Sequence, residues 1–154
     1  MDSTPNQDWV LISSSPLSAG PATGWATRAN GGAVVSFCGT ARTHSPVHDE
    51  VEALEYETNG ECAERSIRRI IGAARTRGPD LDAVGVHHRI GRIVLTEIAT
   101  VAGASAPHRH DAFETAQFYI DTRKKSVPMW KPELWRGGAT WSSDTRAIRE
   151  VPGP

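Results

Sequence analysis

The sequence predicts an α+β protein in which two main helices pack on a mixed or antiparallel sheet within a single compact domain. Two observations carry this prediction. β-prone runs precede the first long helical pattern and return between it and the second, unlike the one-by-one alternation of a doubly wound parallel sheet. The length of 154 residues suits one domain with a substantial core. We expect 1–8 to be a disordered N-terminus, 9–141 the folded domain and 142–154 an irregular tail.

Five short runs have the composition of β-strands and are bounded by glycine or polar residues. They are 9–12, 33–37, 51–57, 83–90 and 93–102. The run 33–37 is almost continuously apolar, which predicts a buried strand, whereas 51–57 alternates in polarity and so has one apolar face. Gly91 separates the last two runs, which predicts a hairpin that turns at this residue.

Two segments have the 3.6-residue periodicity of an amphipathic helix. In 61–77, apolar residues recur at i, i+3, i+4 and i+7, and Gly78 then ends the helix. These apolar residues are Ile67, Ile70, Ile71 and Ala74. The second helix is predicted over 109–125, before Pro128. Its inner side is expected to carry Ala112, Phe113, Ala116, Tyr119 and Ile120.

Two stretches are expected to lack long regular elements. Residues 13–30 are rich in Ser, Gly, Pro and Ala, which predicts a connection with one or two helical turns. The segment from Trp130 onwards holds three of the five Trp residues and is expected to be irregular.

Composition and charge exclude several classes of protein. With 17 Lys+Arg against 18 Asp+Glu, the formal net charge is -1, so no overall basic field favours nonspecific nucleic-acid binding. No apolar run approaches the roughly 20 residues that span a bilayer, and the first residues lack the pattern of a signal peptide. Cys38 and Cys62 are too few for a disulfide framework. We therefore expect a cytoplasmic protein with reduced thiols.

His108 and Arg109 stand where the second long helix is predicted to begin. A helix N-terminus presents free N–H groups and about half a positive charge. A cationic Arg and a titratable His at that point predict an anion seat suited to phosphate. The alternative is that Arg109 pairs with a carboxylate such as Glu114 and that His108 is polar surface.

Three further cations are candidates for a site. Lys124 follows Phe113, Gln117 and Ile120 on one helical face, where desolvation would lower its pKa and suit it to proton transfer. Lys131 stands between Trp130 and Pro132, which restrain its backbone. Arg42 follows a predicted strand end, a common place for functional residues. The alternatives are lysine stems that reach water and an ordinary surface arginine.

Nucleophilic and metal chemistry find less support. Cys38 lies in an apolar run, where cysteine is usually inert packing. His87 and His88 are adjacent on a predicted strand, so their rings point to opposite faces. His108 and His110 have no HxxxH or CxxC partner spacing, so no metal site is expected.

Five stretches taken together are similar to one known family. They are GAVVSFCGTAR (32–42), LEYE (54–57), VHHRIGRI (86–93), PHRHDAFETAQFYID (107–121) and KKSVPMWKPE (124–133). In this order they resemble the large, catalytic subunit of molybdopterin synthase over roughly residues 31–141. Asn59 and Cys62 depart from the usual pattern, as does an insertion at 44–48 within the loop 43–49.

The resemblance implies a sulfurtransferase of molybdenum cofactor biosynthesis. The substrate would be cyclic pyranopterin monophosphate, converted to the molybdopterin dithiolene. The sulfur would come from the C-terminal Gly-Gly thiocarboxylate of a small ubiquitin-like carrier subunit. The large subunit would be a homodimer within a heterotetramer, with one carrier at each end and no metal or organic cofactor.

The resemblance also assigns roles to residues. The positions that match the substrate pocket are Arg42, His108, Arg109, Lys124 and Lys131. Lys124 matches the lysine closest to the inserted carrier tail, and Lys131 the second active-site lysine. Arg146 is the nearest match to a further pocket arginine near the C-terminus.

The spacing of these cations predicts a pocket shared between two chains. From Arg109 to Lys124 is fifteen steps, about 22 Å along a helix, which is too far for one small pterin. Two antiparallel copies could bring Arg109 of one chain beside Lys124 of the other. The alternative function is a non-catalytic adaptor that binds a ubiquitin-like tail or an anionic, nucleotide-like ligand. A hydrolase is disfavoured because no nucleophile motif is present.

Overall fold

The computed structural model describes residues 8–43, 51–126, 132–135 and 138–141. In chain order its elements are β1 (Asp8–Ser13), α1 (Ala19–Ala26), β2 (Ala33–Thr40), β3 (Val51–Tyr56), α2 (Gly60–Arg77), β4 (Val84–Arg89), β5 (Gly91–Val94), β6 (Ile98–Ala106), α3 (Arg109–Ser126), β7 (Pro132–Trp135) and β8 (Gly138–Trp141). The predicted α+β class, with two long helices packed on a mixed sheet, is confirmed.

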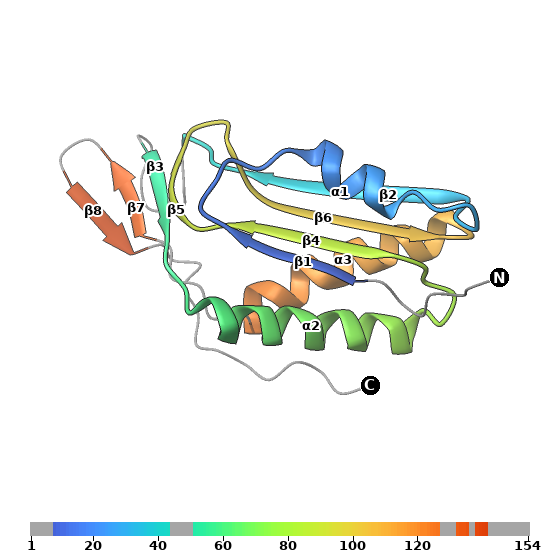
Figure 1. Ribbon diagram of the computed structural model, residues 1–154. Helices are drawn as coiled ribbons and strands as arrows, with labels where there is room; N and C mark the ends of the chain where they lie inside the picture. Colours follow the sequence, from blue (N-terminus) through green and yellow to red (C-terminus); the bar gives the residue numbers. More distant parts are fainter. Residues whose placement is uncertain (1–7, 44–50, 127–131, 136–137, 142–154) are drawn as a thin grey trace.

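The strands form two four-stranded sheets (Figure 1). The first has the order β1-β4-β6-β2, with β1 parallel to β4 and the other pairs antiparallel. Helices α2 and α3 cover one face of this sheet and α1 covers the other. The second sheet, β5-β3-β7-β8, is antiparallel throughout and lies at one end of the molecule.

The main core lies between the first sheet and the α2–α3 layer. The predicted stripe of α2 faces it, and each of its four residues is at most 3% exposed. Complete burial of an isoleucine side chain is worth roughly 1.5–3 kcal/mol. The Asn59 side chain caps the helix start by accepting a hydrogen bond from the Cys62 N–H at 3.1 Å. Burial and capping thus agree with the predicted limits of this helix.

Arg75 ties the end of α2 to the first sheet. Its guanidinium donates to the Asp8 carboxylate of β1, and to the carbonyl oxygens of Leu81 and Asp82 at 2.9 and 3.0 Å. The pair is largely buried and joins residues 67 positions apart. The helix is therefore held to the strand that opens the sheet and to the loop that leads into β4.

Helix α1 lies close to the opposite face because two glycines face it. A Cβ atom on Gly85 would stand 3.4 Å from the Trp25 ring, and one on Gly103 would stand 3.6 Å from the Ala22 carbonyl oxygen. The prediction of one or two helical turns in this connection is confirmed, since α1 has 8 residues.

Three strand predictions need correction. The run 33–37 forms a strand, but β2 is the edge of its sheet and Phe37 remains 39% exposed. The runs 83–90 and 93–102 do pair antiparallel in part, through β4 and β6. The tight turn at Gly91 is wrong, because at φ +83° this glycine leads the chain into β5, which pairs with β3 before β6 begins. The segment after Trp130 contains β7 and β8 rather than only irregular structure.

The predictions of disorder at 1–8 and of an irregular tail at 142–154 fall almost wholly outside the described residues and stay predictions. β1 already begins at Asp8. Among the described residues, no helix is long and apolar enough to cross a membrane.

Candidate active site

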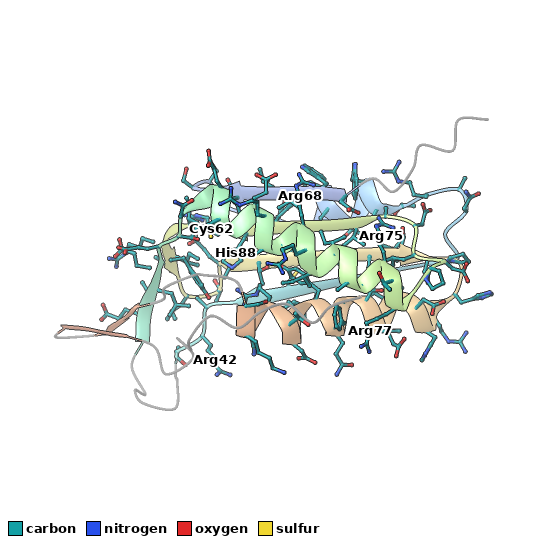
Figure 2. All side chains as sticks on the ribbon, turned by 90° about the horizontal axis from the view of Figure 1, so that it is seen from below. Arg42, Cys62, Arg68, Arg75, Arg77 and His88 are labelled. Atoms are coloured by element: carbon teal, nitrogen blue, oxygen red, sulfur yellow. The ribbon has the colours of Figure 1, made fainter. Side chains whose placement is uncertain are left out.

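Helix α3 separates two groups of predicted site residues. It is continuous from Arg109 to Ser126, so Arg109 and Lys124 lie about 22 Å apart along its axis. Strand β2 runs beside α3 in the same direction (Figure 1). Arg42, just after β2, lies at the end of the molecule where α3 finishes (Figure 2). One chain therefore brings Arg42 and Lys124 to one end, and His108 and Arg109 to the other.

The start of α3 is held against the start of β2. The Gly32 N–H donates to the Ala106 carbonyl oxygen at 3.0 Å, and Gly32 leaves no room for a side chain beside the Pro107 carbonyl. His108 and Arg109 follow at once and are exposed. Both residues line a hollow in the surface. The hollow is formed by Gly32, Pro107, His108, Arg109, His110 and Phe113. The positive end of the helix and two basic side chains thus meet at this hollow, where the sequence predicts an anion seat.

The alternative pairing of Arg109 with Glu114 does not form. Glu114 lies instead 3.6 Å from the Nε2 atom of His110, one helical turn before it. Within the described part of the chain no ion pair engages the guanidinium of Arg109. The predicted anion seat therefore keeps its arginine available for a ligand.

Lys124 is exposed, in contrast to the partly desolvated position expected for it. Phe113, placed on the inner side by the sequence, is 62% exposed, and Gln117 is exposed as well. The reason is that a different set of residues, most of them small, faces the sheet. These are Ala112, Thr115, Ala116, Tyr119, Ile120, Thr122 and Ser126. The described residues therefore leave Lys124 in contact with solvent.

Arg42 has a fixed backbone and an exposed side chain. Its neighbour Ala41 is buried and donates its N–H to the Glu97 carbonyl at 3.1 Å, while the Thr96 N–H donates back to Ala41 at 3.0 Å. These bonds attach the end of β2 to the turn before β6. Arg42 directly follows this attached strand end, and its side chain is exposed.

Cys38 and the histidine pair His87 and His88 are not expected to take part in catalysis or metal binding, and their surroundings agree with this. Burial raises the pKa of the Cys38 thiol, which opposes thiolate formation, although a hydrogen bond with Ser36 acts the other way. His87 packs its ring 4.2 Å from that of Trp9, whereas His88 faces Tyr56 and the helices, so the two rings point to opposite sides.

One possible metal-binding group was missed. The ligand atoms of His110, Asp111 and Glu114 lie within 4.8 Å of one another at the start of α3. The signal was present as His and Glu at i and i+4 on one helix face. These side chains are largely exposed, and the spacing of one helical turn by itself brings His110 and Glu114 to 3.6 Å without a bound metal. Lys131 and Arg146 lie outside the described residues.

The comparison with known proteins decides the family. The sequence pattern of the family described as "MoaE protein" matches residues 12–126. The chain belongs to the MoaE family. The molybdopterin synthase catalytic subunit of Taeniopygia guttata is 32% identical over 138 residues, which are 90% of this chain and 88% of that protein.

Solved structures share the MoaE fold described above. Molybdopterin synthase from Staphylococcus aureus superposes with a TM-score of 0.79 at 29% identity, over 88% of this chain and 96% of that one. A chain from a complex of subunits 1 and 2 of the molybdopterin-converting factor of Helicobacter pylori 26695 superposes with a TM-score of 0.73. It covers 90% of this chain and 92% of its own, but at 17% identity this likeness concerns the fold alone.

Proposed function

We propose that this MoaE-family chain, as a molybdopterin synthase catalytic subunit, uses Lys124 and Lys131 to transfer sulfur to cyclic pyranopterin monophosphate. The sulfur donor is the C-terminal thiocarboxylate of a small ubiquitin-like carrier, and the product is the molybdopterin dithiolene. The observation that carries the proposal is the arrangement of exposed cations at both ends of α3 in a chain of this family. We also infer a cytoplasmic location.

The chemistry requires charge complementarity and proton donation. The thiocarboxylate sulfur attacks a side-chain carbon of the pterin, and the bond from that carbon to oxygen breaks. An ammonium group of Lys124 or Lys131 protonates the departing oxygen and stabilises its developing charge. Water then hydrolyses the thioester between carrier and substrate, which leaves sulfur on the pterin. A second transfer completes the dithiolene.

The other cations bind the cyclic phosphate. Arg42 and Arg109 offer charge-assisted hydrogen bonds, which suit phosphate oxygens better than neutral donors do. His108 adds a donor at the helix start, and Arg146 is assigned to the same pocket. Lys124 lies by the terminal glycine of the carrier, while Lys131 acts chiefly on the substrate.

We infer that the pocket forms between two chains of a homodimer, with one carrier bound at each end of the heterotetramer. The two ends of α3 are about 22 Å apart, so His108 and Arg109 of one chain reach a small substrate only with Lys124 of its partner. A partner chain placed over the anion seat would also cover Phe113, which is 62% exposed there.

Substitution of Lys124 tests the catalytic assignment. In Lys124→Ala we expect dithiolene formation to be almost abolished, while binding of the thiocarboxylated carrier stays within about threefold of wild type, since one proton donor is lost and most of the interface remains. Lys125→Ala is the matched control, because Lys125 is an exposed lysine of the same turn. Near-normal turnover in Lys124→Ala would refute the assignment. A non-catalytic adaptor would bind carrier and give no product even as wild type.

A mixing experiment tests the shared pocket. Heterodimers of a Lys124→Ala chain and an Arg109→Ala chain contain one pocket with both residues intact, so we expect partial recovery of activity from two nearly inactive homodimers. Product formation is measured after co-refolding the two chains. Absence of any recovery, with heterodimers shown to be present, would mean that each pocket belongs to one chain.

A further inference from the structure

Arg123 differs from the two lysines that follow it. All three are basic residues in the last turn of α3, but Lys124 and Lys125 are exposed whereas Arg123 is partly buried and reaches back towards the first sheet. Its Nη1 atom lies 3.0 Å from the Nε2 atom of His88 on β4, 35 residues away in the sequence. The last turn of α3 is thus attached to the sheet by a side chain adjacent to Lys124.

The partner of Arg123 is a fully buried histidine with a defined proton position. The Nδ1 atom of His88 lies 2.9 Å from the Arg89 carbonyl oxygen, which can only accept, so Nδ1 carries the hydrogen. Nε2 then presents its lone pair to the guanidinium, which can only donate. The ring also meets the Tyr56 ring of β3 at 5.1 Å and 73°. Neutral His88 therefore joins β3, β4 and α3.

We propose that His88 and Arg123 are positioning residues that hold Lys124 in its catalytic orientation. Successive residues of a helix point about 100° apart. An Arg123 side chain fixed inwards therefore fixes the direction in which Lys124 leaves the helix. The inference rests on the proposed catalytic role of Lys124.

This contact adds a directional attachment to the packing of the buried Thr122 and Ser126 in the last turn. The final four carbonyl groups of a helix have no partner within it, so helix ends fray. The hydrogen bond from Ser126 Oγ to the Thr122 carbonyl, at 2.8 Å, lies within the helix and does not connect it to the sheet. Tyr119, one turn earlier, is fully buried among apolar groups and holds the middle of α3. The Arg123–His88 contact extends this attachment to the turn that carries Lys124.

Four variants separate positioning from simple stability. Arg123→Met keeps the apolar stem and removes the donor, and His88→Leu removes the acceptor at similar size. His88→Gln restores an acceptor near the Nε2 position. Lys125→Ala removes a charge from the same turn without touching the contact and serves as the control.

The readouts are steady-state turnover of the reconstituted enzyme with thiocarboxylated carrier, and amide hydrogen exchange of the last turn of α3. In Arg123→Met and His88→Leu we expect kcat to fall about tenfold or more, with the KM for substrate within about twofold, because a misplaced catalytic group affects the chemical step. Exchange in the last turn should be roughly tenfold faster. His88→Gln should restore most of the wild-type kcat and most of the wild-type protection from amide exchange. Lys125→Ala should match wild type in both measurements.

The double variant is a further check. If the two residues act through one contact, Arg123→Met combined with His88→Leu should be no slower than the worse single variant. Wild-type kcat in Arg123→Met, with Lys124→Ala inactive, would overturn the positioning role and leave the proposed function standing. An active Lys124→Ala would overturn the proposed function itself, while amide exchange would still report whether the contact holds the turn.

Discussion

Replacement of Gly32 by alanine should damage both the fold and the anion seat. The new Cβ would come closer than 3.0 Å to the Pro107 carbonyl oxygen and to 3.4 Å from the carbonyl carbon. Because these are backbone atoms, no side-chain rotation can relieve the overlap. The Gly32 N–H also bonds to the Ala106 carbonyl at 3.0 Å, so the two segments cannot separate without straining that bond.

The cost follows from these contacts. Overpacking that forces a backbone shift costs typically 1–3 kcal/mol, and a weakened backbone hydrogen bond adds about 0.5–1.5 kcal/mol. We expect the free energy of unfolding to fall by about 2–3 kcal/mol. The shift also moves His108 and Arg109, which follow Pro107 directly. A displacement near 1 Å can reduce turnover by up to about a hundredfold, so we expect at least a tenfold loss in kcat/KM.

Urea unfolding and turnover measure the two effects. The midpoint should move to lower urea with an unchanged slope, which identifies a loss of stability rather than a change in the surface exposed on unfolding. Gly72→Ala in α2 is the control, because nothing lies within 4 Å of its added Cβ. That variant should gain about 0.5–1 kcal/mol. Wild-type stability and turnover in Gly32→Ala would refute the view that this junction positions the anion seat.

Two further predictions concern the folded chain. Ile70→Ala removes a side chain that is 0% exposed in the main core, so the free energy of unfolding measured in urea should fall by about 2–5 kcal/mol, and a loss below 1 kcal/mol would contradict the packing. Burial lowers the pKa of His87 below its ordinary value of 6.5, so the unfolded chain binds a proton that the folded chain does not. Stability should therefore fall as pH drops below about 6.5 and level off beneath the folded-state pKa, and His87→Gln should reduce this slope.

The sequence patterns predicted α2 more accurately than the face of α3. In α2 three isoleucines and Ala74 form one stripe, and all four are buried. In α3 the buried face is made largely of Ala and Thr, so its apolar signal is weak. The sequence pattern therefore places Phe113 on the inner side, whereas the side chain lies on the exposed side. A large aromatic residue predicts the buried face of a helix only when the neighbouring turns carry apolar residues on the same face.

Sheet membership could not be predicted from local patterns. The runs on either side of Gly91 are both β-prone, and a hairpin was the simplest connection between them. The chain instead sends β5 to the second sheet, where it pairs with β3, and returns for β6 to pair with β4. Strand pairing depends on which apolar faces are buried together. Alternation of apolar and polar residues predicts a strand, but it does not indicate the strand with which it pairs.

The same division applies to the site. The order of the motifs along the chain indicates the family. The distance of about 22 Å between Arg109 and Lys124 follows from the sequence as well, because both residues belong to one continuous helix. The contact between His88 and Arg123 joins residues 35 positions apart. It depends on the packing of α3 against the first sheet, because burial brings together side chains that no local repeat relates.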